Sequence, residues 1–168
     1  FQQEKRFVKG SLSRKMKTLV VFYSRTGTTK KVGESIANIL KCDSEEIFDT
    51  KDRMGVIGYI QAGKDAMLKK LTKLKNIQKT SGLYGLVIIG TPVWGFTVST
   101  PIRTYVTENK FKNVAFFCTQ GGSGAEKAFS EMERLIGRKP KALLVLKTKE
   151  VLDGSYFNKV KNFVKKIK

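Results

Sequence analysis

The chain has 168 residues, 40% of them hydrophobic, which suits one globular domain with a well-buried core. It contains no histidine, which excludes a His-based catalytic triad, a histidine general base and a His-ligated zinc site. A net charge of +19, from 33 Lys and Arg against 14 Asp and Glu, favours acidic partners, nucleic acid or an anionic membrane surface.

Residues 1–15 show no clear period and are expected to be a vector-derived or disordered N-terminal segment, with the domain spanning residues 16–168.

The first predicted strand ends in a candidate anion site. The apolar run Lys17–Tyr23 predicts a strand that is buried on both faces. The hydroxyl-rich loop Ser24–Thr29 follows it and leads into a helix predicted over Thr28–Lys41. The unpaired N–H groups at a helix start, together with loop hydroxyls, can bind phosphate. An ordinary N-cap and turn without a ligand is the alternative.

The middle of the chain continues the strand–helix alternation. A weaker strand is predicted near Ser44–Phe48, and Val56–Leu74 has the period of one long amphipathic helix or of a broken pair. The strongest strand pattern covers Leu83–Ile89, and Pro92 in the following loop is expected to end its ladder. Thr100-Pro101 predicts the start of another helix.

The last third repeats the pattern twice more. It predicts a strand at Val114–Cys118, a glycine-rich loop at Thr119–Gly124, a helix over Ala125–Ile136, a strand at Ala142–Leu146 and a helix over Ser155–Ile167. Five strand–helix units without a linker predict an α/β three-layer sandwich, in which helices cover both faces of a parallel sheet. The common five-stranded topology of this kind has strand order 2-1-3-4-5 and a ligand crevice at the carboxyl ends of the first and third strands.

Three loops rich in Gly and Thr follow the first, third and fourth strands, so we expect them to meet at one edge of the sheet. The first offers phosphate donors, the second carries Trp94, and the third offers backbone N–H groups. A phosphate site beside an aromatic side chain suits a phosphorylated planar heterocycle, on which Trp94 could stack. Taken singly, Trp94 is more typical of a core residue, and the glycine loop of a plain turn.

Three motifs resemble those of the flavodoxin family, in particular the short-chain flavodoxin-like FMN-binding proteins, over nearly the whole chain from Met16. They are Ser24-Arg25-Thr26-Gly27-Thr28-Thr29, Gly90-Thr91-Pro92-Val93-Trp94 and Cys118-Thr119-Gln120-Gly121-Gly122-Ser123-Gly124. Arg53–Gly55, Gly58-Tyr59 and Ala62–Ala66 also resemble a stretch found in part of this family.

The resemblance implies FMN bound without a covalent link. It places Ser24, Thr26, Gly27, Thr28 and Thr29 at the phosphate, with Arg25 in the same cofactor-binding loop, Thr91, Pro92, Val93, Trp94 and Gly95 along the ribityl chain and ring, and Thr119, Gln120, Gly121, Gly122 and Gly124 on the other side. Whether Arg25 reaches the phosphate or points to solvent stays open. No residue is expected to be catalytic or to bind metal, and Cys118 is expected to be a small buried hydrophobe.

The resemblance further implies an electron-transfer protein that cycles its flavin between redox states and serves redox partner proteins. The basic charge makes acidic partners the expectation. The alternative is an NAD(P)H-dependent FMN quinone or flavin reductase, so whether the chain is an enzyme stays open. The carrier is favoured because one domain shows no evident nicotinamide-binding module. We expect a cytoplasmic monomer or weak dimer without membrane insertion.

Three other functions are less favoured. A phospho-receiver domain needs an acceptor Asp after the third strand, where Thr91-Pro92 stands. A P-loop NTPase needs the GxxxxGK[ST] spacing, which is absent. A basic module that binds DNA, RNA or anionic lipid with a vestigial flavin site is a third class. Nucleic acid is not the expected partner, because the basic residues after Arg138 are spread along a strand and a helix instead of forming one block.

Overall fold

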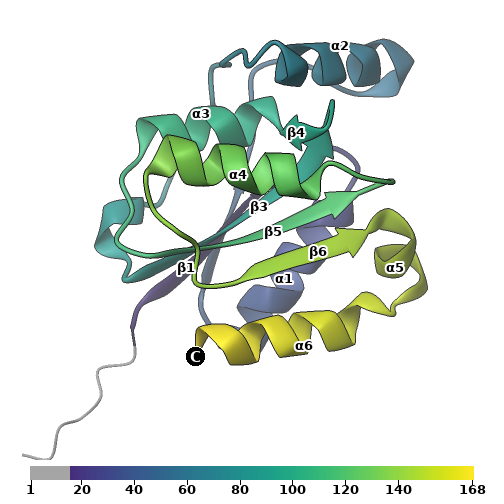
Figure 1. The fold of residues 1–168 in the computed structure, drawn as a ribbon. Helices are drawn as coiled ribbons and strands as arrows, with labels where there is room; N and C mark the ends of the chain where they lie inside the picture. The colour runs from purple at the N-terminus through teal and green to yellow at the C-terminus, as the bar shows by residue number, and fades with distance from the viewer. Residues whose placement is uncertain (1–15) are drawn as a thin grey trace, which may run out of the picture.

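The computed structural model describes residues 16–168, so the expectation for residues 1–15 lies outside the described residues. Five parallel strands pair in the order β2-β1-β3-β5-β6 (Figure 1). They are β1 (Thr18–Tyr23), β2 (Asp43–Ile47), β3 (Leu86–Trp94), β5 (Val114–Gln120) and β6 (Leu143–Lys147). This is the predicted 2-1-3-4-5 order, since the short antiparallel β4 (Thr97–Val98), which was not predicted, pairs only with the end of β3.

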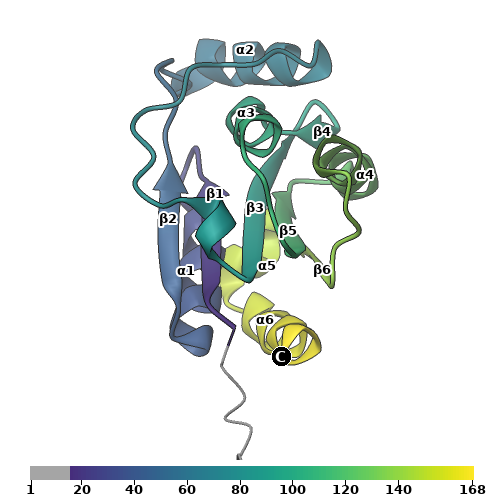
Figure 2. The ribbon, with the colours of Figure 1, turned by 90° about the vertical axis from the view of Figure 1, so that its left-hand side faces the viewer.

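Helices cover both faces of the sheet, which confirms the predicted three-layer sandwich (Figures 1 and 2). One face carries α3 (Thr100–Glu108) and α4 (Ala125–Ile136), and the other carries α1 (Thr28–Leu40), α5 (Thr148–Asp153) and α6 (Tyr156–Ile167). The helix α2 (Gly55–Met67) lies at the periphery, and a 3-10 turn (Ser81–Leu83) precedes β3. Among the described residues, no helix is both long and apolar enough to cross a membrane.

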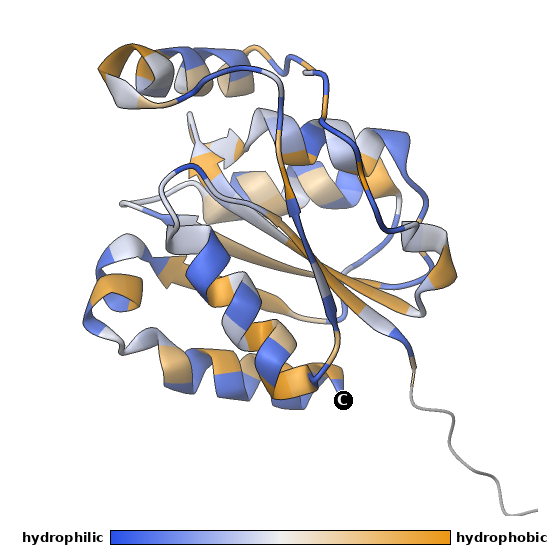
Figure 3. Cartoon of the chain, turned by 180° about the vertical axis from the view of Figure 1, so that it is seen from behind, coloured by the Kyte–Doolittle hydropathy of each residue, from blue (hydrophilic) through white to orange (hydrophobic). Residues whose placement is uncertain are grey.

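The first strand is buried on both faces, as predicted, because its side chains alternate between two hydrophobic layers. Leu19, Val21 and Tyr23 join the layer under α3 and α4. Val20 and Phe22 join the layer under α1 and α6. Figure 3 shows the same hydrophobic character along the central strands. Such two-sided burial is typical of a parallel sheet between two helix layers.

The prediction that Pro92 ends its ladder is wrong. The strand starts later than predicted, at Leu86, and runs through Pro92 to Trp94. Pro92 pairs in register with Thr119 of β5, whereas β1 pairs with β3 only as far as Gly90. Beyond Gly90 the strand has a parallel neighbour on one side only. Proline is tolerated there as it is on an edge strand, because its missing N–H need not face a partner.

The prediction of a helix over Val56–Leu74 is confirmed as far as Met67 and is wrong beyond it, where neither a continued helix nor a second one follows. The helix α2 ends at Met67, and the chain then runs without regular structure beside residues 48–50. Thr50 N–H donates to Lys73 O and Lys75 N–H donates to Phe48 O. These bonds replace the intrahelical ones, and Leu74 packs against the core.

Glu131 joins α4 to α3. Its carboxylate accepts hydrogen bonds from Arg134 on its own helix and from the buried Arg103 on α3. These bonds, from Arg134 first and then from Arg103, lower the pKa of Glu131 from 4.5 to about 2. A folded pKa below the unfolded value means that the stabilisation is present above pH 4.5 and is lost as the pH falls toward 2.

Glu131→Gln is therefore expected to flatten the pH dependence of unfolding between pH 4.5 and about 2. At neutral pH it should lower the free energy of unfolding by about 3 kcal/mol, because Arg103 then lies buried without its carboxylate. Urea unfolding across this pH range measures both effects. Glu126→Gln, at an exposed position on the same helix, is the matched control. Parallel pH curves for Glu131→Gln and the unmodified protein would show that the carboxylate does not supply this stability.

Candidate functional site

The loop after β1 presents a helix start to the edge of the sheet. Gly27 has φ of 95°, and its N–H donates to Ser24 Oγ at 3.0 Å. The first helical bond runs from Lys31 N–H to Gly27 O, so the N–H groups of residues 28–30 precede any intrahelical acceptor. A Cβ added at Gly27 would have no heavy atom within 4 Å, so the space beside this helix start is open.

The loop after β3 is a tight hairpin between Trp94 and Thr97. Both central residues have positive φ, 53° at Gly95 and 63° at Phe96. A Cβ at Gly95 would lie 2.4 Å from Met67 Cγ and 2.7 Å from the carbonyl oxygen of Gly63. Only glycine fits this position, because the turn presses against α2. The turn leaves the Phe96 ring on the surface with an exposed fraction of 60%.

The loop after β5 closes the other side of the edge. Thr119 Oγ1 shares a hydrogen bond of 2.7 Å with Thr29 Oγ1 of α1, which fixes the first and third loops together. Gln120 Oε1 accepts a hydrogen bond from Ala125 N–H and so caps the start of α4. Gly124 has φ of 112°, and a Cβ there would lie 2.8 Å from Phe96 Cα, so glycine lets the third loop approach the hairpin.

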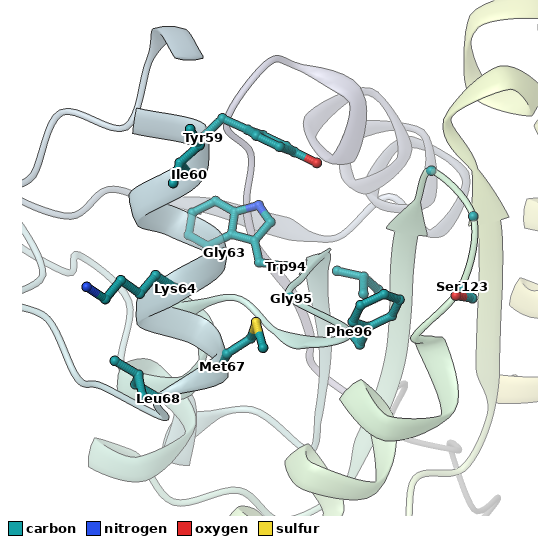
Figure 4. A pocket seen from close by; sticks show the side chains of 13 residues that line it. Tyr59, Ile60, Gly63, Lys64, Met67, Leu68, Trp94, Gly95, Phe96 and Ser123 are labelled. Atoms are coloured by element: carbon teal, nitrogen blue, oxygen red, sulfur yellow. The ribbon is translucent and has the colours of Figure 1, made fainter. Parts of the chain in front are cut away.

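Two adjoining cavities lie between these loops. The polar cleft, of about 250 Å³, is lined by Ser24, Arg25, Thr26, Thr28, Thr29, Tyr59, Pro92, Val93, Trp94, Thr119, Gln120, Gly121 and Thr148. The apolar cleft, of about 670 Å³, is lined by Tyr59, Ile60, Gly63, Lys64, Met67, Leu68, Val93, Trp94, Gly95, Phe96, Gly121, Gly122 and Ser123 (Figure 4). Since Tyr59, Val93, Trp94 and Gly121 line both, the two clefts form one continuous site.

Trp94 is a core residue that shows little of its surface to this site. Its exposed fraction is 6%, and its ring meets Tyr23 edge-on at a centroid distance of 5.2 Å. The guanidinium of Arg53 lies 5.4 Å from the Trp94 ring centroid. The interpretation of Trp94 as a core residue is therefore correct, and the exposed aromatic rings of the apolar cleft are Tyr59 and Phe96.

Arg53 is buried against the Trp94 ring and forms ion pairs with two acids. Its Nε donates to Asp49 at 2.7 Å, and its Nη1 donates to Asp65 of α2 at 3.1 Å. Desolvation opposes the charged form of Arg53, but the two carboxylates outweigh it and raise its pKa. Burial likewise acts to raise the pKa of Asp65, yet the hydrogen bond from Arg53 and nearby lysines lower it overall. Arg53 and Asp65 therefore stay ionised, and the ion pairs of Arg53 with Asp49 and Asp65 tie α2 to the core.

Arg25 turns toward α2 instead of toward the helix start. Its Nη1 donates to the carbonyl oxygen of Arg53 at 3.4 Å, and its guanidinium lies 5.2 Å from the Tyr59 ring centroid. It forms a wall of the polar cleft in this position. Cys118 is fully buried, and burial raises the pKa of its thiol to about 12, so it remains a neutral, small hydrophobic residue as expected.

Most of the predicted site residues lie together. Ser24, Arg25, Thr26, Thr28, Thr29, Pro92, Val93, Trp94, Thr119, Gln120 and Gly121 line the polar cleft, and Gly95 and Gly122 line the apolar cleft. Gly27, Thr91 and Gly124 line neither. Thr91 is fully buried and bonds Ser99 instead, where it anchors the start of α3. Contact of any of these residues with FMN remains a prediction.

The sequence reasoning missed several residues of the clefts: Tyr59, Ile60, Gly63, Lys64, Met67, Leu68, Phe96, Ser123 and Thr148. Thr148 follows the last predicted strand, so the sequence could have indicated that it lies at the same edge of the sheet. Tyr59 belongs to Gly58-Tyr59, one of the further segments that resemble the family, and could also have been included. The packing of α2 against the hairpin was not visible in the sequence.

The donor set of this site fits a ligand with an anionic end and a planar apolar end. Unpaired helix N–H groups and hydroxyls gather in the polar cleft, which suits phosphate. Aromatic and aliphatic side chains line the apolar cleft, which suits a ring system. The Cβ positions of Gly121 and Gly122 have no heavy atom within 4 Å, so the third loop leaves room for a ligand against its backbone. FMN has both ends.

Comparison with known proteins gives the same family as the motifs. The family model described as Flavodoxin matches residues 17–167. A flavoprotein from Lactobacillus acidophilus NCFM, solved in complex with FMN, is 25% identical, with a TM-score of 0.62 and 83% of this chain and 97% of that chain covered. A protein from Bacteroides uniformis ATCC 8492 described as a flavoprotein is 24% identical, with a TM-score of 0.72 and coverage of 89% and 98%.

A more distant structure has the same fold. It is an NADH:FMN oxidoreductase in its apo form, 12% identical, with a TM-score of 0.52 and 88% of each chain covered. No curated protein matches the sequence significantly.

Proposed function

Because this chain belongs to the flavodoxin family, we propose that it binds FMN across the polar and apolar clefts and carries electrons between redox partner proteins. The observation that carries the proposal is the continuity of the two clefts at the carboxyl edge of the sheet. A helix start lies at one end of this site and exposed aromatic rings lie at the other.

The polar cleft would hold the phosphate. The N–H groups of residues 28–30 point out of the start of α1, where the helix dipole adds positive potential. The hydroxyls of Ser24, Thr26 and Thr28 lie in the same cleft and can donate to phosphate oxygens. Thr29 is already bonded to Thr119, so its role is to hold the first and third loops in register.

The apolar cleft would hold the ring. Tyr59 and Phe96 are its exposed aromatic side chains, with exposed fractions of 62% and 60%. Trp94 adds a small exposed surface, and Gly121 and Gly122 bring the backbone of the third loop against the cleft. FMN would supply the redox chemistry when bound, since the cofactor itself accepts and donates the electrons. These residues bind and orient it and exclude water from part of its surface.

The partners are proposed to be acidic proteins, because the mouth of the apolar cleft carries Lys64 and the chain as a whole has a net charge of +19. We also propose a cytoplasmic location and a monomeric or weakly dimeric state. Electron transfer to an acidic partner should then slow steeply with salt, as expected for a charge-steered encounter.

Titration with FMN and with riboflavin tests the placement of the phosphate. We expect riboflavin, which lacks the phosphate, to bind at least about 100-fold more weakly, because two charge-assisted hydrogen bonds are lost. Quenching of flavin fluorescence gives both dissociation constants. Equal affinities would show that the polar cleft does not recognise phosphate.

A second candidate is an FMN-dependent NAD(P)H quinone or flavin reductase. It is favoured by the size and apolar lining of the larger cleft, where Ile60, Met67 and Leu68 could meet an apolar electron acceptor. Steady-state oxidation of NADPH or NADH with a quinone, and without an added reductase, separates the two functions. A pure carrier turns over neither coenzyme alone, whereas sustained turnover would assign the enzyme.

A further inference from the structure

The helix α2 and the segment after it leave an unusual number of apolar side chains on the surface. Val56, Ile57, Tyr59, Ile60, Met67, Leu68 and Leu71 have exposed fractions between 53% and 76%. We call these residues the α2 face. The helix lies at the edge of the molecule, apart from the two helix layers (Figures 1 and 2).

The orientation of the helix explains this exposure. Gly58, Ala62 and Ala66 are its buried residues, together with Asp65. A Cβ at Gly58 would lie 2.4 Å from the backbone carbon of Arg53, so glycine there allows close approach of the backbone. Small residues therefore face Arg53 and the core, and at 100° per residue Val56 and Ile60 lie on the far side of the helix, whereas Met67 packs against the hairpin at Gly95.

The same region is strongly basic. Exposed lysines flank the α2 face at Lys51, Lys64, Lys69, Lys70, Lys73 and Lys75. Over residues 51–75 the acids are Asp52, which is exposed, and Asp65, which is buried and paired with Arg53. Lys51 and Lys70 each lie 3.4 Å from Asp65, which offsets part of their charge. The α2 face is thus an apolar strip on a peripheral helix, with a positive surround.

The combination of exposed apolar side chains and surrounding lysines indicates which kind of partner could cover the α2 face. A second copy of the chain would bring two sets of these lysines together, and like charges repel. An acidic protein offers carboxylates to the lysines but no necessary partner for the apolar side chains, whereas the interface of an anionic bilayer offers both charged headgroups and acyl chains. Exposed aliphatic and aromatic side chains flanked by lysines are the pattern of helices that lie in the interface of anionic membranes.

We propose that the α2 face docks this protein on the surface of an anionic lipid bilayer. The apolar side chains enter the boundary between headgroups and acyl chains, and the surrounding lysines contact anionic headgroups. The helix lies on the membrane and does not cross it. Tyr59, Ile60, Met67 and Leu68 also line the apolar cleft, so the docked face borders the mouth of the proposed flavin site.

Flotation of the FMN-loaded protein with vesicles tests this proposal. Vesicles of phosphatidylcholine with phosphatidylglycerol should carry the protein, and vesicles of phosphatidylcholine alone should not. The experiment is repeated without FMN and should give the same result, so a failure of the flavin site is seen separately in the flavin absorbance.

Two pairs of variants identify the surface. Ile57→Ser with Ile60→Ser should weaken vesicle binding by at least roughly tenfold. Leu83→Ser with Leu152→Ser, at exposed leucines on other elements, should leave it unchanged. Lys73→Gln with Lys75→Gln should weaken binding by about fivefold per lysine. Lys165→Gln with Lys166→Gln, the same charge change on α6, should have a much smaller effect.

Three results would overturn the proposal. The first is no binding to anionic vesicles. The second is equal loss in the α2 variants and their controls, which would assign the binding to net charge alone. The third is a concentration-dependent dimer in sedimentation velocity that the Ile57→Ser, Ile60→Ser variant abolishes, which would make a second copy the occupant of the α2 face.

Discussion

Thr28→Glu is expected to lower the affinity for FMN by about 100-fold or more while leaving the fold intact. Thr28 is the first residue of α1 and lines the polar cleft. A carboxylate there competes with phosphate for the same N–H groups and repels it, which costs about 3 kcal/mol at a separation of ~6 Å and an effective dielectric of ~20. An acid in the first turn also favours the helix dipole, so thermal stability without FMN should not fall.

Ser155→Glu is the matched control for this substitution. Ser155 precedes α6, where it makes no side-chain capping bond, and it lines neither cleft. Its FMN affinity should equal that of the unmodified protein, as measured by fluorescence titration. Riboflavin should lose much less affinity than FMN in Thr28→Glu. Unchanged binding of FMN to Thr28→Glu would place the phosphate elsewhere in the molecule.

Arg53→Met is expected to lower the free energy of unfolding by about 3–5 kcal/mol, because it leaves Asp49 and Asp65 buried without their cation. Arg53 itself is only 4% exposed, so solvent cannot compensate the two carboxylates without local opening. For a domain of this size such a loss corresponds to roughly 6–20 °C in Tm. Trp94, the only tryptophan, packs against Arg53, so its fluorescence should shift to longer wavelength in the variant.

Arg134→Met provides the comparison for a surface arginine. Its side chain is largely exposed although it pairs with Glu131, so its removal should cost about 1 kcal/mol or less. Arg53→Lys should lower the free energy of unfolding by an amount between the losses in Arg53→Met and Arg134→Met, because a lysine keeps the charge but cannot bridge both acids with a planar group. A loss below about 1 kcal/mol in Arg53→Met would show that the buried pairs do not hold α2 to the core.

The strand order and the position of the clefts were predictable because both follow from local patterns. The continuous apolar run of β1 and the hydroxyl-rich loop after it are encoded within a few neighbouring residues. Right-handed crossovers then bring the loops after β1, β3 and β5 to one edge. The buried role of Cys118 followed from its place in a strand between two helix layers.

The errors arise where tertiary contacts override the local pattern. The period of residues 56–74 is helical, but the sequence does not say that Gly58 and Ala62 would face the protein and leave Ile60 exposed. Proline often ends a strand. At Pro92, however, β3 no longer pairs with β1, so the missing N–H does not interrupt that ladder. In the sequence, Asp49 and Arg53 look like parts of a polar loop and Asp65 like a residue of the following helix, and only the fold brings the three together beside Trp94.

The visible absorption spectrum of the purified protein, after incubation with FMN and removal of unbound flavin by desalting, tests the central claim most directly. The account predicts retained flavin bands that correspond to one flavin per chain, with the released cofactor chromatographing as FMN. A desalted protein without flavin absorbance would contradict it, because the polar and apolar clefts would then be features of the scaffold and not a cofactor site.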